Sequence, residues 1–283
     1  MSRWRTLLNL GRVSNLPTVW SNCLAGWWLG GGGNLRAIPW LLAGATLLYT
    51  GGMFLNDAFD VEFDRQRRKE RPIPSGAISA GAVWFWGFAL LAAGEACLLV
   101  VGLQTAALGL TLLLCIVVYD AVHKLVAFSP ALMGFCRLLL YLVAASTGAD
   151  GITGRALWCA LALAVYVVGL SYMARVESTR GPIHCWPVIL LAAPVVLALF
   201  MNAGPYRNPA LLLAGILALW ILRSLRPALW SAERRVGRTV AHLLAGIVLV
   251  DLLAVADLPR DFAWAFFGLF GLALVLQRFV PAT

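Results

Sequence analysis

Charged side chains are scarce in this sequence: only 12% of its 283 residues are Asp, Glu, Lys or Arg, whereas 61% are hydrophobic. A soluble globular domain carries about 25% charged residues, so the shortage excludes a soluble protein of ordinary composition. Acidic residues are the scarcer kind, which leaves a net charge of +9. The basic residues are scattered among apolar segments instead of forming one soluble face, and this argues against nucleic-acid binding. The sequence predicts an integral membrane protein.

Cysteine motifs and domain boundaries are also lacking. None of the six cysteines forms a CxxC pair or has metal-ligand spacing, so we expect neither a disulfide nor a zinc site. The first apolar run shows no small-residue cleavage site, and we expect it to remain as a helix. Without a linker or low-complexity segment, the chain is predicted to be a single domain, 1–283, with no evident need for a protein partner.

Long apolar runs are what the sequence does have. A membrane-spanning helix needs about 20 mostly apolar residues. Ten runs meet this requirement, the last two least clearly: 13–32, 37–57, 79–102, 104–122, 129–149, 155–176, 184–203, 208–225, 239–256 and 261–279. Their connections are short and rich in Gly, Pro and Asn, which favours antiparallel neighbours. The fold class predicted is therefore all-α, a bundle of nine to ten membrane helices.

The distribution of Lys and Arg predicts the orientation of this bundle. If the N-terminus is cytosolic, the outside connections hold only Arg36, Arg155, Arg207 and Arg260 of the 22 basic residues, and Arg137 lies within a helix. All the others fall on the cytosolic side, as the positive-inside rule requires. We expect an integral protein of a bacterial inner membrane, with its N-terminus and its charged connections in the cytosol.

One cytosolic connection, NDAFDVEFDRQRRKERPIPSG at 56–76, holds ten charged side chains. If the preceding helix continues for two more turns, Asn56, Asp60 and Asp64 are stacked on one face, with Asp57 about 100° around the helix. Mg²⁺ prefers oxygen ligands of this kind together with the oxygens of a phosphate, which the basic residues that follow could bind. A solvated helix end with arginines that anchor the topology is the alternative interpretation.

The same stretch resembles the first aspartate-rich motif of the UbiA superfamily of intramembrane prenyltransferases, through NDAFDVEFD and RPIPSG. The resemblance implies a helix bundle around a central cavity, in which Mg²⁺ holds the diphosphate of an isoprenyl donor and the prenyl chain lies in an apolar tunnel. It implies metal ligation by Asn56, Asp60 and Asp64, with Asp57 alongside as a catalytic residue together with Asp60 and Asp64. The basic residues expected to bind the diphosphate here are Arg67, Arg68 and Arg71.

Three further segments are candidates for diphosphate binding. YDAVHK is similar to a family segment in which a Tyr and a Lys, here Tyr119 and Lys124, face the diphosphate; a lysine at the membrane edge is the alternative. Arg12 resembles an arginine near the start of the family's first helix, although it could equally be a cytosolic anchor. Arg137 lies inside an apolar run, where it must face a polar cavity or a carboxylate. His123 is interpreted as a lone interfacial histidine.

The family's second aspartate-rich motif is incomplete in this chain. Counting back from Gly181, Glu177 takes the place of the last acidic residue and of a metal ligand, but Met173 stands where another carboxylate is expected. Arg175 and Arg180 lie in the same segment and are candidates to bind the diphosphate directly. This departure looks most like the UbiA-like EboC branch.

Two functions from different classes follow. The first is Mg²⁺-dependent transfer of an isoprenyl group from its diphosphate to a lipophilic or aromatic acceptor, with the general base left open between Asp57 and Asp120. The second is a degenerate protein that binds or translocates an isoprenoid or aromatic metabolite without catalysis, which the incomplete second motif favours. An ordinary secondary transporter would place paired carboxylates or broken helices at mid-membrane, and the sequence indicates neither.

Overall fold

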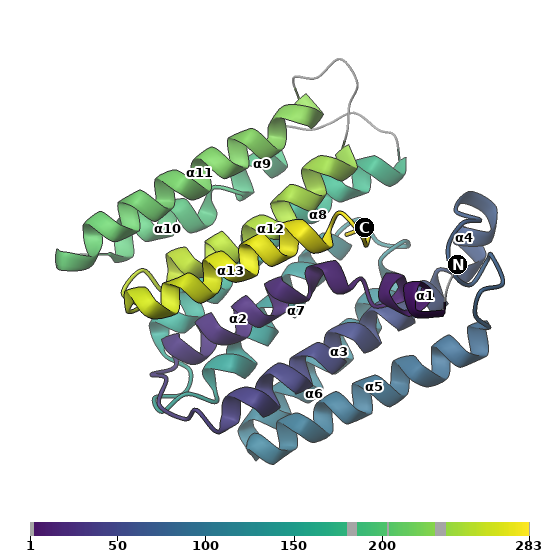
Figure 1. Ribbon diagram of the computed structural model, residues 1–283, viewed down its shortest axis with the longest axis horizontal. Coiled ribbons are helices and arrows are strands. Elements are labelled where there is room, and N and C mark those ends of the chain that lie inside the picture. Colours follow the sequence, from purple (N-terminus) through teal and green to yellow (C-terminus); the bar gives the residue numbers. More distant parts are fainter. Residues whose placement is uncertain (1–2, 180–185, 203, 230–235, 283) are drawn as a thin grey trace.

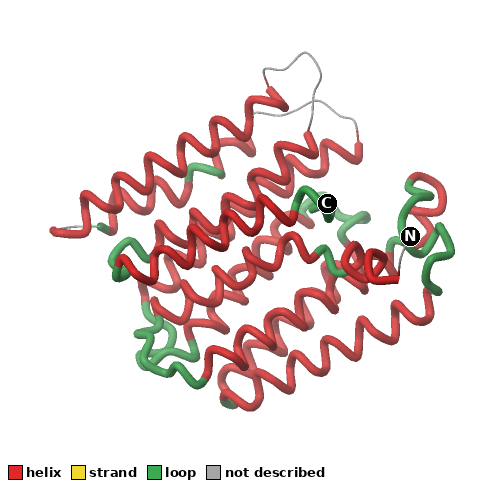
Figure 2. Tube along the Cα trace, in the orientation of Figure 1, coloured by secondary structure: helices red, strands yellow, loops and turns green. Residues whose placement is uncertain are grey.

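The computed structural model describes residues 3–179, 186–202, 204–229 and 236–282, and these contain helices but no strand (Figures 1 and 2). The all-α prediction is confirmed. The α-helices are α1 (Arg3–Leu10), α2 (Leu16–Leu29), α3 (Ala37–Phe59), α4 (Val61–Arg67), α5 (Ala80–Val101), α6 (Leu103–Val122), α7 (Ser129–Ala145), α8 (Gly154–Thr179), α9 (Trp186–Leu190), α10 (Ala193–Met201), α11 (Arg207–Leu229), α12 (Val236–Ala254) and α13 (Arg260–Leu276). Short 3₁₀ turns occupy Val13–Asn15 and Gly204–Tyr206.

The helices are those of a membrane protein. In the described segments, six are long and apolar enough to cross a bilayer, and three apolar stretches of 10–17 residues accompany them. Many large apolar side chains face outwards, among them Phe200 and Leu103, which suits a lipid environment and not water. The run predicted at 184–203 is divided into α9 and α10, where Pro194 begins a new helix.

The core of the bundle is built mainly on α8 and α12. Their buried side chains, with Tyr166 and Leu243 at the centre, form one apolar cluster together with parts of α2, α7, α11 and α13. A second cluster joins α2, α3, α5, α6 and α7 around Leu48 and Leu91. Helices α2 and α7, which contribute to both clusters, therefore lie where the two halves of the bundle meet.

Close packing fixes α3 against α5. A Cβ atom added at Gly51 would lie 2.8 Å from the carbonyl oxygen of Gly87, and Gly44 meets Gly94 in the same way at 3.0 Å. Small residues at membrane helix interfaces allow such backbone approach. Because α3 leads directly into α4, this contact positions the charged stretch beyond the end of α3.

Short elements and both described chain ends gather at one end of the bundle, with α1 and α4 (Figure 1). There the backbone of Arg12 is left-handed, with φ of 40°, at the turn between α1 and α2. The C-terminal tail is attached beside it, because Asn15 Nδ2 donates to the carbonyl oxygen of Ala282 at 2.9 Å and Ser14 Oγ to that of Pro281 at 3.4 Å.

Candidate functional site

The charged stretch 56–76 begins with a row of side chains on nearly continuous helix. The amide of Asp60 donates to the carbonyl of Asn56 at 3.0 Å and that of Asp64 to Asp60 at 2.9 Å, so the hydrogen-bond ladder passes from α3 into α4. Asn56 and Asp64 are buried and Asp60 is half-buried. The three side chains predicted to share a face are therefore spaced one helical turn apart.

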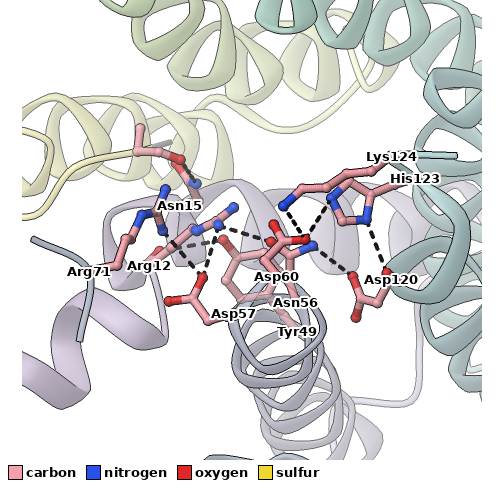
Figure 3. Close-up of polar contacts among 11 residues, drawn as sticks. Arg12, Asn15, Tyr49, Asn56, Asp57, Asp60, Arg71, Asp120, His123 and Lys124 are labelled. Carbon is pink, nitrogen blue, oxygen red and sulfur yellow. Dashed lines mark hydrogen bonds and ion pairs between the residues drawn. The ribbon is translucent and has the colours of Figure 1, made fainter. Parts of the chain in front are cut away.

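Two arginines from different segments converge on one end of this row (Figure 3). Arg12 Nη2 donates to Asn56 Oδ1 at 3.0 Å and to Asp57 Oδ1 at 3.3 Å. Arg71 Nη1 donates to the same Asp57 oxygen, also at 3.3 Å. Asp57 is nearly fully buried, with 5% of its side chain exposed. A single carboxylate thus faces two guanidinium groups.

The connection after α6 supplies a lysine and a histidine on the other side of the row (Figure 3). Lys124 Nζ lies 2.6 Å from Asp60 Oδ1, and His123 Nε2 lies 3.4 Å from the same oxygen. Lys124 also sits over the ring of Phe63, 3.8 Å from its centroid. Contrary to its interpretation as a lone interfacial residue, His123 has a partner, which lies on another helix and so escaped any search by local spacing.

The pKa values show which charges lack compensation. Burial alone would raise the pKa of Asp60, but hydrogen bonds from His123 and Lys124 lower it below its ordinary value. Burial raises the pKa of Asp64, which accepts no such hydrogen bond, and the nearby charges of Arg71 and Lys124 oppose this rise without reversing it. Burial and the nearby charge of Arg12 lower the pKa of Arg71 in spite of Asp57.

Arg12 shows the opposite balance: burial alone would lower its pKa, but Asp57 and other neighbours raise it. The two arginines contact the same carboxylate, that of Asp57. Among the described residues, Asp64 forms no ion pair within 4.0 Å.

An open cavity of about 310 Å³ lies on the arginine side. Its lining includes three arginines, Arg12, Arg68 and Arg71, and one acidic residue, Glu70, and Pro281 of the C-terminal tail forms part of its wall. Two buried polar atoms near it, Asn9 Oδ1 and Arg12 Nε, have no hydrogen-bond partner within the described ranges. We call it the arginine cavity; its charge and size suit a phosphate or diphosphate.

A second cavity, of about 80 Å³, lies between α3, α6 and α7 and is apolar. Aliphatic side chains such as Leu48 and Ile116 line it, and its polar groups are Tyr49, Tyr119, Asp120 and Arg137. Asp120 also accepts a hydrogen bond from Asn56 Nδ2 at 3.0 Å. This apolar cavity therefore begins next to the acidic row.

Arg137 is held by groups on α2. Its guanidinium donates to Asn22 Oδ1 at 2.7 Å and to Thr18 Oγ1 at 3.0 Å. Asn22 in turn donates to Asp251 of α12, which also accepts from Ser21 and is fully buried. Arg137 thus lies in a polar environment, as predicted, and Asn22 connects its guanidinium to the carboxylate of Asp251. Asp251 was not among the site residues predicted from the sequence, although it is the only acidic residue in the apolar run 239–256.

The remaining predicted residues lie apart from the acidic row or outside the described residues. Arg67 is exposed and packs over Phe63 at 5.1 Å. Arg175 donates to the carbonyl oxygens of Val126 and Ala127, so it ties α8 to the connection that carries Lys124. Met173 is buried in the core. The side chain of Glu177, and Arg180 altogether, lie outside the described residues.

The chemistry of the row fits Mg²⁺. No group of three or more His, Cys, Asp and Glu side chains that could hold a metal occurs in the part of the chain that the structure describes. Mg²⁺, however, needs only one or two carboxylates when a phosphate and waters complete its octahedron. Asp64 Oδ1 is buried and has no hydrogen-bond partner among the described residues, as expected of an oxygen reserved for a cation.

Comparisons with known proteins show what the chain is similar to. The model of the UbiA prenyltransferase family matches residues 15–240. Digeranylgeranylglyceryl phosphate synthase of Methanothrix thermoacetophila is 40% identical over 111 residues, 38% of this chain and 40% of that protein. Prenyltransferase stbC of Stachybotrys bisbyi is 29% identical over 108 residues, 37% and 32% of the two chains. The matched part thus spans less than half the length of these curated relatives.

Solved structures share the fold at low sequence identity. A UbiA homolog from Aeropyrum pernix K1 has a TM-score of 0.69 and 16% identity, covering 91% of this chain and 99% of that one. A UbiA homolog from Archaeoglobus fulgidus bound to GPP and Mg²⁺ has a TM-score of 0.66 and 14% identity, covering 94% and 99%. With its helix bundle, its acidic row and a family match over most of its length, the chain belongs to the UbiA prenyltransferase family.

Proposed function

We propose that the protein transfers an isoprenyl group from an isoprenyl diphosphate to a lipophilic or aromatic acceptor within the membrane. The observation that carries this proposal is a buried acidic oxygen without a partner, close to two arginines that share a carboxylate. Among the described residues Asp64 Oδ1 has no hydrogen-bond partner, which suits a cation, and Arg12 and Arg71 both contact Asp57 beside the arginine cavity, which suits an anion. A magnesium diphosphate brings a cation and an anion together, and so supplies both.

Asn56, Asp60 and Asp64 would hold the Mg²⁺, and Glu177 stays a predicted ligand. When bound, Mg²⁺ stabilises the negative charge that develops on the departing diphosphate. Lys124, Arg68 and Arg71 would bind the diphosphate oxygens, and Tyr119 lines the apolar cavity. That cavity would exclude water from the start of the prenyl chain. A relative in the same family has been solved with GPP and Mg²⁺, which supports this class of donor.

We place the site on the cytosolic side of a bacterial inner membrane. The acidic row passes from the end of α3 into α4, and Arg12, Arg71 and Lys124 meet it there (Figure 3), at the end of the bundle that carries α1 and α4 (Figure 1). Most Lys and Arg residues fall in connections predicted for that side, in keeping with the positive-inside rule. Membership of the EboC branch stays a prediction.

Purified protein incubated with Mg²⁺ and a panel of labelled prenyl diphosphates tests the function. Wild-type protein is expected to release diphosphate in the presence of an acceptor, and Asp60→Ala and Asp64→Ala are each expected to abolish release. Asp257→Ala is the control, because this carboxylate pairs with Arg155 in the connection after α12, far from the acidic row. Release that survives both substitutions would refute the proposed site.

A second candidate function is binding or translocation of an isoprenoid or aromatic metabolite without transfer. Met173 favours it, since a buried apolar side chain stands where the family's second motif expects a carboxylate. In the same assay, this function predicts tight Mg²⁺-dependent binding of a prenyl diphosphate with no turnover for any acceptor. Absence of binding would refute both functions.

A further inference from the structure

Asp120, the last acidic residue of α6, has a carboxyl group with two different oxygens. Oδ1 accepts the hydrogen bond from Asn56 Nδ2 at 3.0 Å. Oδ2 is buried and has no hydrogen-bond partner anywhere in the described chain. Only 3% of the residue is exposed. A buried oxygen without a hydrogen bond is costly in free energy. We therefore expect Oδ2 to accept a hydrogen bond from a bound molecule.

The surroundings of Asp120 indicate where that donor would come from. Asp120 contributes the only carboxyl group to the lining of the apolar cavity, and Asn56 joins it to the acidic row. The junction between the proposed diphosphate site and an apolar cavity is where the reactive carbon of a prenyl diphosphate would lie. An acceptor substrate must bring its nucleophilic atom to this same junction.

The other carboxylates of the site have charged partners through one oxygen or a proposed role in binding the metal. Asp57 accepts from both Arg12 and Arg71, and Asp60 binds Lys124. Asp64 is the proposed position of the cation. In contrast, no ion pair within 4.0 Å engages Asp120 among the described residues. Asp120 thus combines a place in the lining of the apolar cavity with a buried oxygen that has no partner among the described residues, which suits a substrate hydroxyl.

We propose that Asp120 is a catalytic residue for the acceptor and that the acceptor is an alcohol or a phenol. Oδ2 accepts a hydrogen bond from the acceptor's O–H group and takes the proton when that bond breaks. The acceptor oxygen forms a bond to C1 of the prenyl group, while the bond from C1 to the diphosphate breaks and its electron pair leaves with the diphosphate. This inference rests on the proposed prenyl transfer and narrows its acceptor.

Farnesol and its methyl ether distinguish a hydroxyl-binding site from a merely apolar one, because only the alcohol can donate a hydrogen bond. Their binding to the purified full-length protein is compared for wild type and Asp120→Asn. We expect wild type to bind farnesol about tenfold or more tightly than the ether. Asn at this position can turn its oxygen to Asn56 and its amide nitrogen to the cavity, so the preference should vanish or reverse.

Glu95→Gln is the matched control, since it makes the same carboxyl-to-amide change in a membrane helix away from the cavity, and it should keep the wild-type preference. Equal binding of the two compounds by wild type, or an unchanged preference in Asp120→Asn, would overturn the inference. Mg²⁺-dependent binding of farnesyl diphosphate is measured on the same samples. Its absence in wild type would refute the proposed function, whereas its loss only in Asp120→Asn would indicate a structural role through Asn56 and overturn the inference.

Discussion

Replacing Asp57 by Asn should lower the free energy of unfolding of the ligand-free protein and tighten its binding of pyrophosphate. Each arginine contact of Asp57 spans 3.3 Å, a distance at which a charge pair gains about 5 kcal/mol at an effective dielectric constant of about 20. Desolvation offsets much of this, and removal of one partner from a buried ion pair costs about 3–5 kcal/mol. Because Arg12 and Arg71 keep 18% and 17% of their side chains exposed, we expect a loss of stability at the lower end of this range, about 3 kcal/mol.

The same substitution leaves two guanidinium groups facing the arginine cavity without a carboxylate. An anion there no longer competes with Asp57, so we expect magnesium pyrophosphate to bind about tenfold more tightly. Thermal unfolding of the purified protein over a pyrophosphate titration measures both effects.

Asp257→Asn is the control for this prediction. Asp257 forms a two-point pair with Arg155 at 2.6 and 2.9 Å in the connection after α12. Its loss should lower stability without altering pyrophosphate binding. Weaker binding of pyrophosphate by Asp57→Asn would refute the reasoning, because it would mean that the carboxylate assists the anion instead of competing with it.

Three other substitutions test separate parts of the structure. Lys124→Met removes the 2.6 Å partner of Asp60 and should weaken prenyl diphosphate binding by about tenfold in a direct binding assay; an unchanged dissociation constant would leave Lys124 as a membrane-edge lysine. Gly51→Ala should cost about 1–3 kcal/mol in thermal unfolding, whereas Gly81→Ala, where an added Cβ meets nothing within 4 Å, should not destabilise. Arg137→Met should lower the free energy of unfolding by about 3–5 kcal/mol, because Asn22 and Thr18 would lose their buried hydrogen-bond donor. Equal melting temperatures of this variant and the wild type would contradict a stabilising role of Arg137.

The sequence was sufficient for features that depend on neighbouring residues. Apolar run length predicted an all-α membrane bundle, although six helices in the described segments are long and apolar enough to span, against ten predicted runs. The four-residue spacing of Asn56, Asp60 and Asp64 predicted their one-turn spacing along the helix. Helix α1 was not predicted, since its eight residues are too few to register as a membrane span. The break between α9 and α10 was missed as well, although Pro194 was a visible signal.

Contacts between distant segments could not be predicted in the same way. Asp60 meets Lys124, and Asn56 meets Asp120, only because α3 and α6 pack with a particular rotation and offset. Those quantities depend on the shapes of many apolar side chains at once, and helical periodicity does not encode them. The same holds for Asp251, whose partners on α2 lie at the other end of the chain.

The attachment of the C-terminal tail affects how the protein should be labelled. Pro281 is part of the wall of the arginine cavity, and Ala282 is hydrogen-bonded to Asn15. A purification tag or fluorescent reporter joined after residue 283 would therefore be tethered next to the proposed diphosphate site, where it could alter activity while it reports membrane sidedness. The turn at Gly102 lies between α5 and α6, and an added Cβ there meets nothing within 4 Å. An epitope inserted at this turn would report topology from the opposite end of the bundle (Figure 1).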